Sequence, residues 1–276
     1  GSSRQLGEGT KAWSWTRDTG YTQLFTFPSA ANAISSTGSV IGGWVNTFDG
    51  PQAYIRRSAS DVDYLGFLGS RPSGTTSSVY SLNFDGSVAV GTSSAVIADR
   101  RAFRWVQGHG MQDLGSLTES GESYAFDVSD DGSIVVGQSY DYRTGRAFRW
   151  NPDTGMSELA MLGGGISASA AGVSGDGRIA VGTCYTGTGS RAVIWDQNLN
   201  VLDLNSYLPS IGVDVNGWTL TSTTSISADG SVICGYGLIE GRQGAWVVRG
   251  LPIPGASAAP LLLSVAATIR RRRCRS

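Results

Sequence analysis

Short segments of alternating apolar and polar residues recur along this chain, and most are followed by a glycine-containing turn. In the Arg-Ala-Phe-Arg-Trp segment that begins at Arg101, alternation places Phe103 and Trp105 on one face of a strand and the residues between them on the other. The run from Ile134 to Val136 is apolar on both faces, as in a strand that lies between two neighbours. The pattern therefore predicts a series of short β-strands.

A four-residue turn of sequence Ser/Asn-x-Asp-Gly recurs between predicted strands. The aspartate can cap the turn through its side chain, and the glycine supplies the positive φ that closes a hairpin. We expect each turn to join an antiparallel pair of strands. The turns are Asn83–Gly86, Ser129–Gly132, Ser174–Gly177 and Ser227–Gly230.

These segments belong to five imperfect repeats of about 45 residues and a partial sixth. The alanines that open the copies are 41, 49, 45, 45 and 53 residues apart, and they are Ala12, Ala53, Ala102, Ala147, Ala192 and Ala245. Counted from these alanines, each repeat has the Asp-Gly turn between its third and fourth strands. The alternative frame begins with the Asp-Gly hairpin and leaves the first repeat without its opening strands.

Four strands in about 45 residues is the size of a propeller blade. The expected fold is all-β, a β-propeller of four-stranded blades that is incomplete at its N-terminus, with helix confined to a short apolar segment of the C-terminal tail. Aromatic pairs of the opening strands, such as Trp13 with Trp15 and Phe103 with Trp105, are expected to pack between adjacent blades. A β-solenoid and a string of separate hairpins are the alternatives.

The sequence divides into three segments. Residues 1–8 are read as a leader fragment, residues 9–250 as the propeller, and residues 251–276 as a sorting tail. Glycine is abundant, at 39 residues, which suits tight turns. Five of the 21 basic residues lie in the last seven positions, which leaves 16 basic against 22 acidic residues in the rest of the chain. This mildly acidic body excludes nucleic acid as a partner.

No catalytic constellation is evident, and we expect a noncatalytic protein with no cofactor and no metal. The repeated aspartates of the Asp-Gly turns would be held far apart by a ring of blades, so they are interpreted as turn formers rather than calcium ligands. His109, the single histidine, is expected in a solvated turn. Cys184 and Cys234 are interpreted as buried thiols, with a disulfide as the alternative; Cys274 lies in the tail.

Arginines recur immediately before the opening alanines, at Arg101, Arg146 and Arg191. Recurrence at one structural position indicates packing against an aromatic ring or pairing with a turn carboxylate, rather than an anion site.

The clearest departure from the repeat is the longer fifth unit, Asn205 to Thr221. It carries the candidate ligand-binding residues Asp214, Asn216 and Trp218. Trp218 and two tyrosines, Tyr140 and Tyr142, could stack on sugars, although Trp218 could equally pack in the core.

The composition changes abruptly at Leu251. A Pro-x-Pro-Gly segment is followed by an uncharged, largely apolar stretch from Ala256 to Ile269 and then by four consecutive arginines. Fourteen helical residues span about 21 Å, less than the ~30 Å hydrocarbon core of a bilayer. Arginines after an apolar segment would hold its C-terminal end on the cytoplasmic side.

Two resemblances follow from these motifs. The phrase Arg-Ala-Phe-Arg-Trp, Gly-Met-x-Asp-Leu-Gly, Val-Ser-x-Asp-Gly, Val-Val-Gly resembles the HAF repeat of bacterial extracellular proteins over about residues 9–250, with arginine where that family's name has histidine. The tail resembles a PEP-CTERM sorting signal, with isoleucine in the middle of the Pro-x-Pro motif. The residues that carry this second resemblance are Pro252, Pro254, Gly255, Arg270, Arg271, Arg272 and Arg273.

These resemblances imply an exported protein that is anchored transiently in the inner membrane through its tail and processed by an exosortase-type enzyme. The destination would be the cell surface or the extracellular matrix. Our first hypothesis for function is a noncatalytic surface or matrix propeller whose loops bind glycans or other matrix proteins. The second is a propeller enzyme, a hydrolase or lyase acting on extracellular polysaccharide; Asp-box propellers of the sialidase type are a precedent, but their turn spacing differs.

Overall fold

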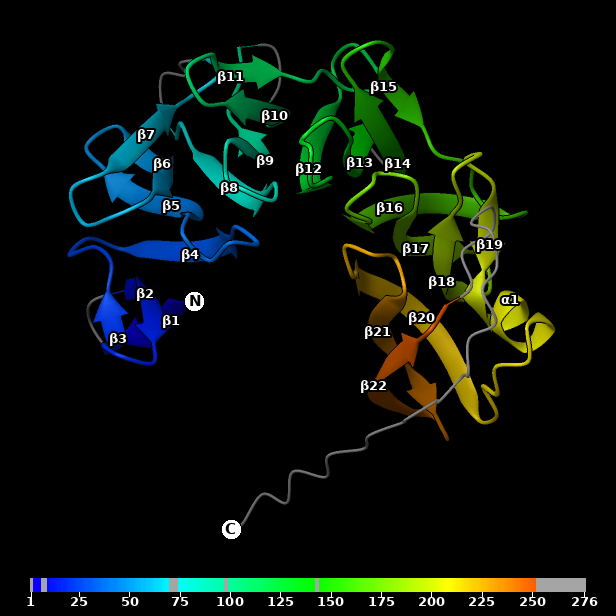
Figure 1. Ribbon diagram of the computed structural model, residues 1–276. Helices are drawn as coiled ribbons and strands as arrows, with labels where there is room; N and C mark the ends of the chain where they lie inside the picture. Colours follow the sequence, from blue (N-terminus) through cyan, green and yellow to red (C-terminus); the bar gives the residue numbers. More distant parts are fainter. Residues whose placement is uncertain (1, 6–8, 70–73, 97–98, 142–143, 252–276) are drawn as a thin grey trace. The chain divides into compact units, whose positions relative to one another are not determined.

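A computed structural model describes residues 2–5, 9–69, 74–96, 99–141 and 144–251. The chain forms two compact units, Gly1–Glu158 and Leu159–Ser276, which are described in turn. In the described part, every element but one is a β-strand, and every strand pairing is antiparallel. Each sheet is a meander, in which consecutive strands are neighbours (Figure 1). We refer to the sheets as blades 1 to 6 in chain order.

The first unit contains blades 1 to 4. Blade 1 has three strands, β1 (Ser2–Gln5), β2 (Gly9–Thr16) and β3 (Gly20–Gln23). Blade 2 has four strands, β4 (Ser29–Ile34), β5 (Ile41–Thr47), β6 (Gly50–Arg56) and β7 (Val62–Gly66). Blade 3 consists of β8 (Ser77–Leu82), β9 (Val88–Ser93), β10 (Arg101–Val106) and β11 (Gly110–Asp113). Blade 4 consists of β12 (Glu122–Val128), β13 (Val135–Asp141), β14 (Thr144–Asn151) and β15 (Gly155–Glu158).

The second unit contains blades 5 and 6 and the helix. Blade 5 consists of β16 (Gly165–Val173), β17 (Ala180–Thr186), β18 (Gly189–Trp195) and β19 (Val201–Asp203). Helix α1 (Leu204–Ser210) follows directly. Blade 6 has three strands, β20 (Trp218–Ile226), β21 (Val232–Ile239) and β22 (Arg242–Arg249).

The prediction of an all-β propeller of four-stranded blades is confirmed, but the alternative frame is the one that the sheets adopt. The Asp-Gly turn at Ser129–Gly132 joins β12 to β13, the first two strands of blade 4, and the Ala-Phe-Arg-Trp segment lies on the third strand, β14. A repeat can be cut at any point of its period, whereas hydrogen bonding decides which four strands form one sheet. Among the described residues, blade 1 accordingly has no counterpart of the first strand, and one strand of its sheet, β1, lies within the residues interpreted as a leader.

Packing between blades follows the alternation in the third strands. In the first unit, Phe103 and Trp105 of β10 lie in a cluster with residues of blade 2, and Ala102 faces a second cluster with Phe148 and Trp150 of blade 4. Trp15 of blade 1 differs from the expectation, because its side chain is 57% exposed. In the second unit, one cluster joins blade 5, α1 and blade 6.

Helix α1 corrects the expectation that helix would be confined to the tail. Asp203 is its N-cap and accepts a hydrogen bond from the Asn205 amide, while Leu204 and Leu208 are buried in the cluster between blades 5 and 6. The extra residues of the fifth unit thus form a helical turn that covers an apolar surface. The tail helix and the sorting-signal residues predicted at 252–276 lie outside the described residues. Among the residues that are described, no helix is both long enough and apolar enough to span a bilayer.

Candidate functional site

The predicted binding residues Asp214, Asn216 and Trp218 lie between α1 and β20 in the second unit. Asp214 caps a turn, since its carboxylate accepts a 2.8 Å hydrogen bond from the Asn216 amide. Trp218 is half-buried and packs against the cluster between blades 5 and 6, and its indole ring lies over Gly244. The three residues therefore lie in one short segment, in which Asp214 caps a turn and Trp218 packs against the core.

The turn aspartates form hydrogen bonds within their own turns, as predicted. The carboxylates of Asp85, Asp131, Asp176 and Asp229 each accept a hydrogen bond of 2.9–3.0 Å from the amide two residues later. The first residue of each turn also contributes, and Ser129 Oγ donates to Asp131 at 2.6 Å while accepting from the Ile134 amide at 2.9 Å. The turn glycines have positive φ, 73° at Gly132 for example. The hairpin at Ser35 is equivalent, but Thr37 stands in place of aspartate, which is why the sequence motif missed it.

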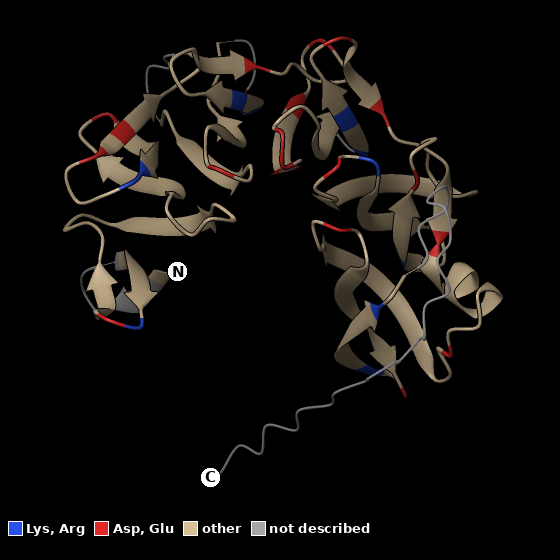
Figure 2. Ribbon diagram, viewed as in Figure 1, with Lys and Arg blue, Asp and Glu red and all other residues tan. Residues whose placement is uncertain are grey.

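Hydrogen bonding in the turns lowers the pKa of three of these carboxyls. At Asp85 and Asp229 the main cause is the hydrogen bond with a serine hydroxyl of the turn, Ser87 and Ser227 respectively. At Asp131 burial raises the pKa, but the hydrogen bonds from Ser129 and Ser133 outweigh it, and the net shift is downward. Figure 2 shows acidic residues on many of the loops that join strands.

Of the remaining candidates, His109 lies in a turn, and Cys184 and Cys234 lie on strands. His109 is exposed in the turn between β10 and β11, with Nδ1 3.2 Å from the Gln107 carbonyl oxygen, as expected for a solvated turn residue. Cys184 and Cys234 are free thiols, the first buried and the second half-buried. Burial raises the pKa of the Cys184 thiol. Cys274 and Tyr142 lie outside the described residues.

Among the described residues, neither Arg101 nor Arg146 forms an ion pair with an aspartate of the Asp-Gly turns. Arg101 is buried and donates to Ser116 Oγ and to the Glu119 carbonyl, each at 2.7 Å. Arg146 forms a 2.6 Å ion pair with Glu158, a residue of the adjacent strand β15. Two arginines that do not precede an opening alanine pack on aromatic rings, and the first is Arg56, whose guanidinium lies 5.4 Å from the ring centre of Phe25. The Arg104 guanidinium lies 5.8 Å from the ring centre of Trp150 and donates to the Gly132 carbonyl at 2.8 Å.

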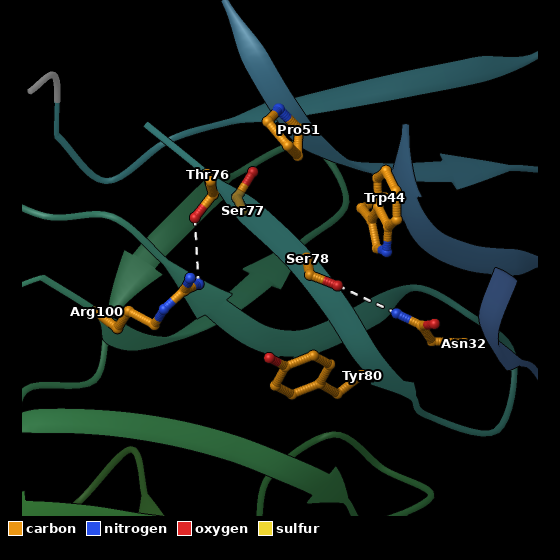
Figure 3. Close-up of a pocket in the computed structure, with 8 residues that line it drawn as sticks. All are labelled: Asn32, Trp44, Pro51, Thr76, Ser77, Ser78, Tyr80 and Arg100. Carbon is orange, nitrogen blue, oxygen red and sulfur yellow. Dashed lines mark hydrogen bonds between the residues drawn. The ribbon is translucent and has the colours of Figure 1, made fainter. Parts of the chain in front are cut away.

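A pocket between blades 2 and 3 brings together chemistry that the sequence did not reveal. Its volume is about 450 Å³. Figure 3 shows Trp44 and Tyr80 on either side of Ser78, with Arg100 beyond Thr76. The lining residues, which we call the blade 2–3 pocket, are Asn32, Trp44, Pro51, Thr76, Ser77, Ser78, Tyr80 and Arg100. Two aromatic rings, an amide, hydroxyl groups and one charged group therefore share one concave surface.

A β-bulge in the first strand of each of blades 2 to 6 recurs along the chain, and it presents some of these side chains. In blade 3, Val79 pairs with Gly91 and Ser81 with Val90, so Tyr80 between them has no partner in the ladder. The same irregularity occurs at Asn32 in blade 2 and at Phe126 in blade 4. A bulge of this kind redirects one side chain of the strand.

The glycine that ends each Val-Val-Gly phrase permits this bulge. A Cβ on Gly91 would lie 2.0 Å from the Ser78 carbonyl oxygen, and a Cβ on Gly137 would lie 1.9 Å from that of Tyr124. Any larger residue would push the two strands apart. The recurrent glycine was the signal from which the bulge positions, and hence Asn32, Tyr80 and Phe126, could have been found.

Aromatic side chains continue from the pocket along blades 3 and 4. The rings of Tyr80 and Phe126 stack with their centres 6.2 Å apart, and Phe126 stacks on Tyr124 at 6.3 Å. Tyr140, which the sequence suggested as a sugar-stacking residue, meets Tyr124 edge-on at 5.8 Å. We call Tyr80, Phe126, Tyr124 and Tyr140 the aromatic row.

Arg100 is the charged group of the pocket, and its positive charge affects two tyrosines of the aromatic row, Tyr80 and Tyr124. One of its Nη atoms donates to Thr76 Oγ1 at 3.2 Å. Burial raises the pKa of Tyr80, and the positive charge of Arg100 opposes that shift. Burial also raises the pKa of Tyr124, whose hydroxyl donates to Glu122 at 2.8 Å and again experiences the charge of Arg100. Glu122 is thus engaged by Tyr124 and is not among the residues that line the pocket.

No protein-family model matches the sequence, and no curated protein matches it. Solved structures with a similar fold include TolB from Acinetobacter baumannii, with a TM-score of 0.55 and 14% identity over 88% of this chain. They also include a protein described as TolB from Agrobacterium tumefaciens, with a TM-score of 0.56 and 11% identity over 87% of this chain and 86% of that one. A third is the β-propeller domain of the Trilobed protease from Pyrococcus furiosus, with a TM-score of 0.57 and 8% identity over 91% of this chain and 76% of that domain.

At these identities the likeness concerns the fold alone, and it agrees with the β-propeller built from the strands above. The chain spans 58% of the length of the Acinetobacter baumannii TolB chain.

Proposed function

We propose that this β-propeller is an exported, noncatalytic binding protein of the cell surface or extracellular matrix, and that it binds glycans through the blade 2–3 pocket and the adjoining aromatic row. The observation that carries the proposal is the grouping of Trp44 and Tyr80 around the polar side chains of Asn32 and Ser78. A pyranose ring has an apolar C–H face and a rim of hydroxyl groups. A pocket with aromatic faces and short polar side chains complements both.

The dimensions of the pocket support a small or extended saccharide as ligand. Its volume of about 450 Å³ lies within the ~300–1,000 Å³ that is usual for ligand pockets. The aromatic row extends the surface from blade 3 across blade 4, so that successive sugar units of one polymer could contact successive rings. This arrangement differs from our first expectation in one respect, because the side chains come mainly from strands rather than from long loops.

The proposal of a noncatalytic role rests on the chemistry of the pocket wall. Its eight lining residues include no carboxylate, histidine or cysteine that could transfer a proton near neutral pH. Export and surface association rest on the sequence, namely the resemblance of the repeats to HAF proteins and of the tail to a PEP-CTERM signal.

Binding of the full chain to a panel of soluble polysaccharides by isothermal titration calorimetry tests the proposal. We expect Trp44→Ala and Tyr80→Ala each to weaken binding at least tenfold, since each removes a stacking face. Tyr185→Ala is the matched control, because this tyrosine is 44% exposed on the second unit and lies outside the pocket. Binding that is equally strong in all three variants, or no binding by the parent protein, would refute the proposal.

A further inference from the structure

The electrostatics of the blade 2–3 pocket indicate which glycans it would take. Of its eight lining residues, Arg100 alone carries a full charge, and that charge is positive. Elsewhere the body of the protein is mildly acidic, with 22 acidic residues in the whole chain and many of them on loops (Figure 2). A single cation in an aromatic pocket is therefore a local feature and not part of a basic surface.

Arg100 has donors to offer a ligand. A guanidinium group has five N–H donors in a planar fork. Within the described part of the chain, the Arg100 side chain makes one hydrogen bond, to Thr76 Oγ1, and no ion pair. Two other arginines of the first unit do form ion pairs, Arg57 with Asp61 and Asp63, and Arg146 with Glu158.

Other polar groups of the pocket are also available. Asn32 donates through Nδ2 to Ser78 Oγ and to the Val79 carbonyl, at 3.1 and 2.9 Å, which leaves its Oδ1 facing no described donor. The Trp44 indole N–H and the Tyr80 hydroxyl likewise have no hydrogen-bond partner among the described residues. The pocket can therefore donate to and accept from sugar hydroxyl groups while Arg100 neutralises an acidic substituent.

We propose that the blade 2–3 pocket selects acidic polysaccharides, with Trp44 and Tyr80 stacking on the sugar ring and Arg100 pairing with an anionic ring substituent. This inference rests on the proposed function. A carboxylate of a uronic acid and a sulfate ester share the geometry that a guanidinium fork recognises through two parallel hydrogen bonds. Nucleic acid is not the expected ligand, because its binding depends on several cations along the phosphate backbone and this pocket has one.

The test compares four polymers with the full chain by isothermal titration calorimetry. They are polygalacturonate, its fully methyl-esterified form, dextran sulfate and poly-glutamate. The inference predicts binding to polygalacturonate or to dextran sulfate, and the tighter of the two identifies the anion. Binding of the neutral methyl ester is expected to be at least tenfold weaker than that of polygalacturonate if the carboxylate is recognised.

Variants assign the effect to Arg100. Arg100→Gln removes the charge and is expected to weaken binding of the preferred acidic polymer at least tenfold, while Arg100→Lys retains the charge without the fork and gives an intermediate loss. Arg242→Gln is the matched control, because this exposed arginine lies on β22 of the second unit. Far-UV circular dichroism checks that each variant folds.

Several outcomes would overturn the inference. Equal affinity for polygalacturonate and its methyl ester, together with no binding of dextran sulfate, would show that charge is not recognised. Unchanged affinity in Arg100→Gln would place the anion contact elsewhere, and poly-glutamate binding as tightly as the sugars would indicate a peptide site. If instead neutral polymers bind and Trp44→Ala abolishes that binding, the proposed function stands and the preference for acids fails. If no polysaccharide binds at all, the proposed function fails as well.

Discussion

At the scale of single residues, small side chains hold the blades of the first unit together. Ser29, Ser77 and Ser123 are fully or almost fully buried, and each hydroxyl oxygen accepts a hydrogen bond from the amide of the opening alanine on the preceding blade, at 2.8–3.1 Å. Each hydroxyl also donates to a backbone carbonyl. These serines satisfy backbone groups that would otherwise be unpaired between two sheets. The repeat contains them, but without the structure a serine in a strand has no evident role.

We predict that Ser123→Ala lowers stability by about 1–3 kcal/mol, because the Ala102 amide and the Gly115 carbonyl both lose a buried partner. Urea unfolding followed by tryptophan fluorescence measures the change. Ser36→Ala is the control, since Ser36 is exposed in the Ser35 turn. A midpoint in Ser123→Ala that matches the control would argue against this role.

A second residue-scale prediction concerns catalysis in the longer fifth unit. Asp214 caps a turn and Trp218 packs on the core, so we expect no turnover of polysaccharides or sialosides by the purified protein. Asp214→Ala should leave that result unchanged. Reducing-end and sialic-acid release assays provide the measurement. Turnover well above background that disappears in Asp214→Ala would establish the enzyme hypothesis instead.

At the scale of elements, the Asp-Gly hairpins link the sequence motif to the architecture. The sequence predicted these turns and their antiparallel pairs correctly, since the signals are local: an aspartate side chain reaches an amide two residues away, and glycine adopts positive φ. The sequence did not predict the blade frame, because hydrogen bonding between strands decides which four of them form one sheet. It did not predict the first-strand bulges, because the role of the repeated glycine becomes apparent only against the carbonyl oxygen of the neighbouring strand. Helix α1 was not predicted either, because its two buried leucines face an apolar surface that forms only when blades 5 and 6 are in place.

The hairpins predict how stability depends on pH. The pKa values of Asp85, Asp131 and Asp229 are lowered in the folded state, so these carboxyls bind protons more weakly when folded than when unfolded. Their contribution to stability is therefore present above the pKa of an unfolded aspartate, about 4, and is lost as pH falls through the lower folded-state values.

Thermal unfolding measured between pH 7 and pH 2 tests this expectation. The triple variant Asp85→Asn, Asp131→Asn, Asp229→Asn should lose less of its melting temperature on acidification than the parent protein. Asp153→Asn is the control, because Asp153 is exposed and its carboxylate accepts no hydrogen bond among the described residues. An acid dependence that is the same in the triple variant and in the parent would contradict the assignment.

At the scale of the whole molecule, the repeat predicted the fold class because every blade uses the same alternation and the same turn. The candidate site was not predicted for the opposite reason. Its residues come from two blades, and Trp44, Tyr80 and Arg100 are not equivalent positions of the repeat. Only Tyr140, at the far end of the aromatic row, was singled out beforehand. A departure within one repeat unit is visible in the sequence, whereas this pocket forms between two such units.

The tail gives a prediction about the mature protein. In a host that contains an exosortase, exported protein should lack residues Arg270 to Ser276, and replacing Arg270 to Arg273 by glutamine should leave unprocessed precursor. Intact-mass spectrometry of the exported fraction measures both. Exported protein that still ends in Ser276 would exclude processing at this tail.

The most direct measurement of the central claim is a crystal structure of the protein with an acidic oligosaccharide, such as a tetragalacturonate. We predict that the sugar occupies the blade 2–3 pocket, with one ring against Trp44 or Tyr80 and its carboxylate within hydrogen-bonding distance of Arg100. The neighbouring sugar units of the oligosaccharide should extend along the aromatic row toward Phe126. An oligosaccharide bound instead at Asp214 and Trp218, with the blade 2–3 pocket empty, would contradict the account.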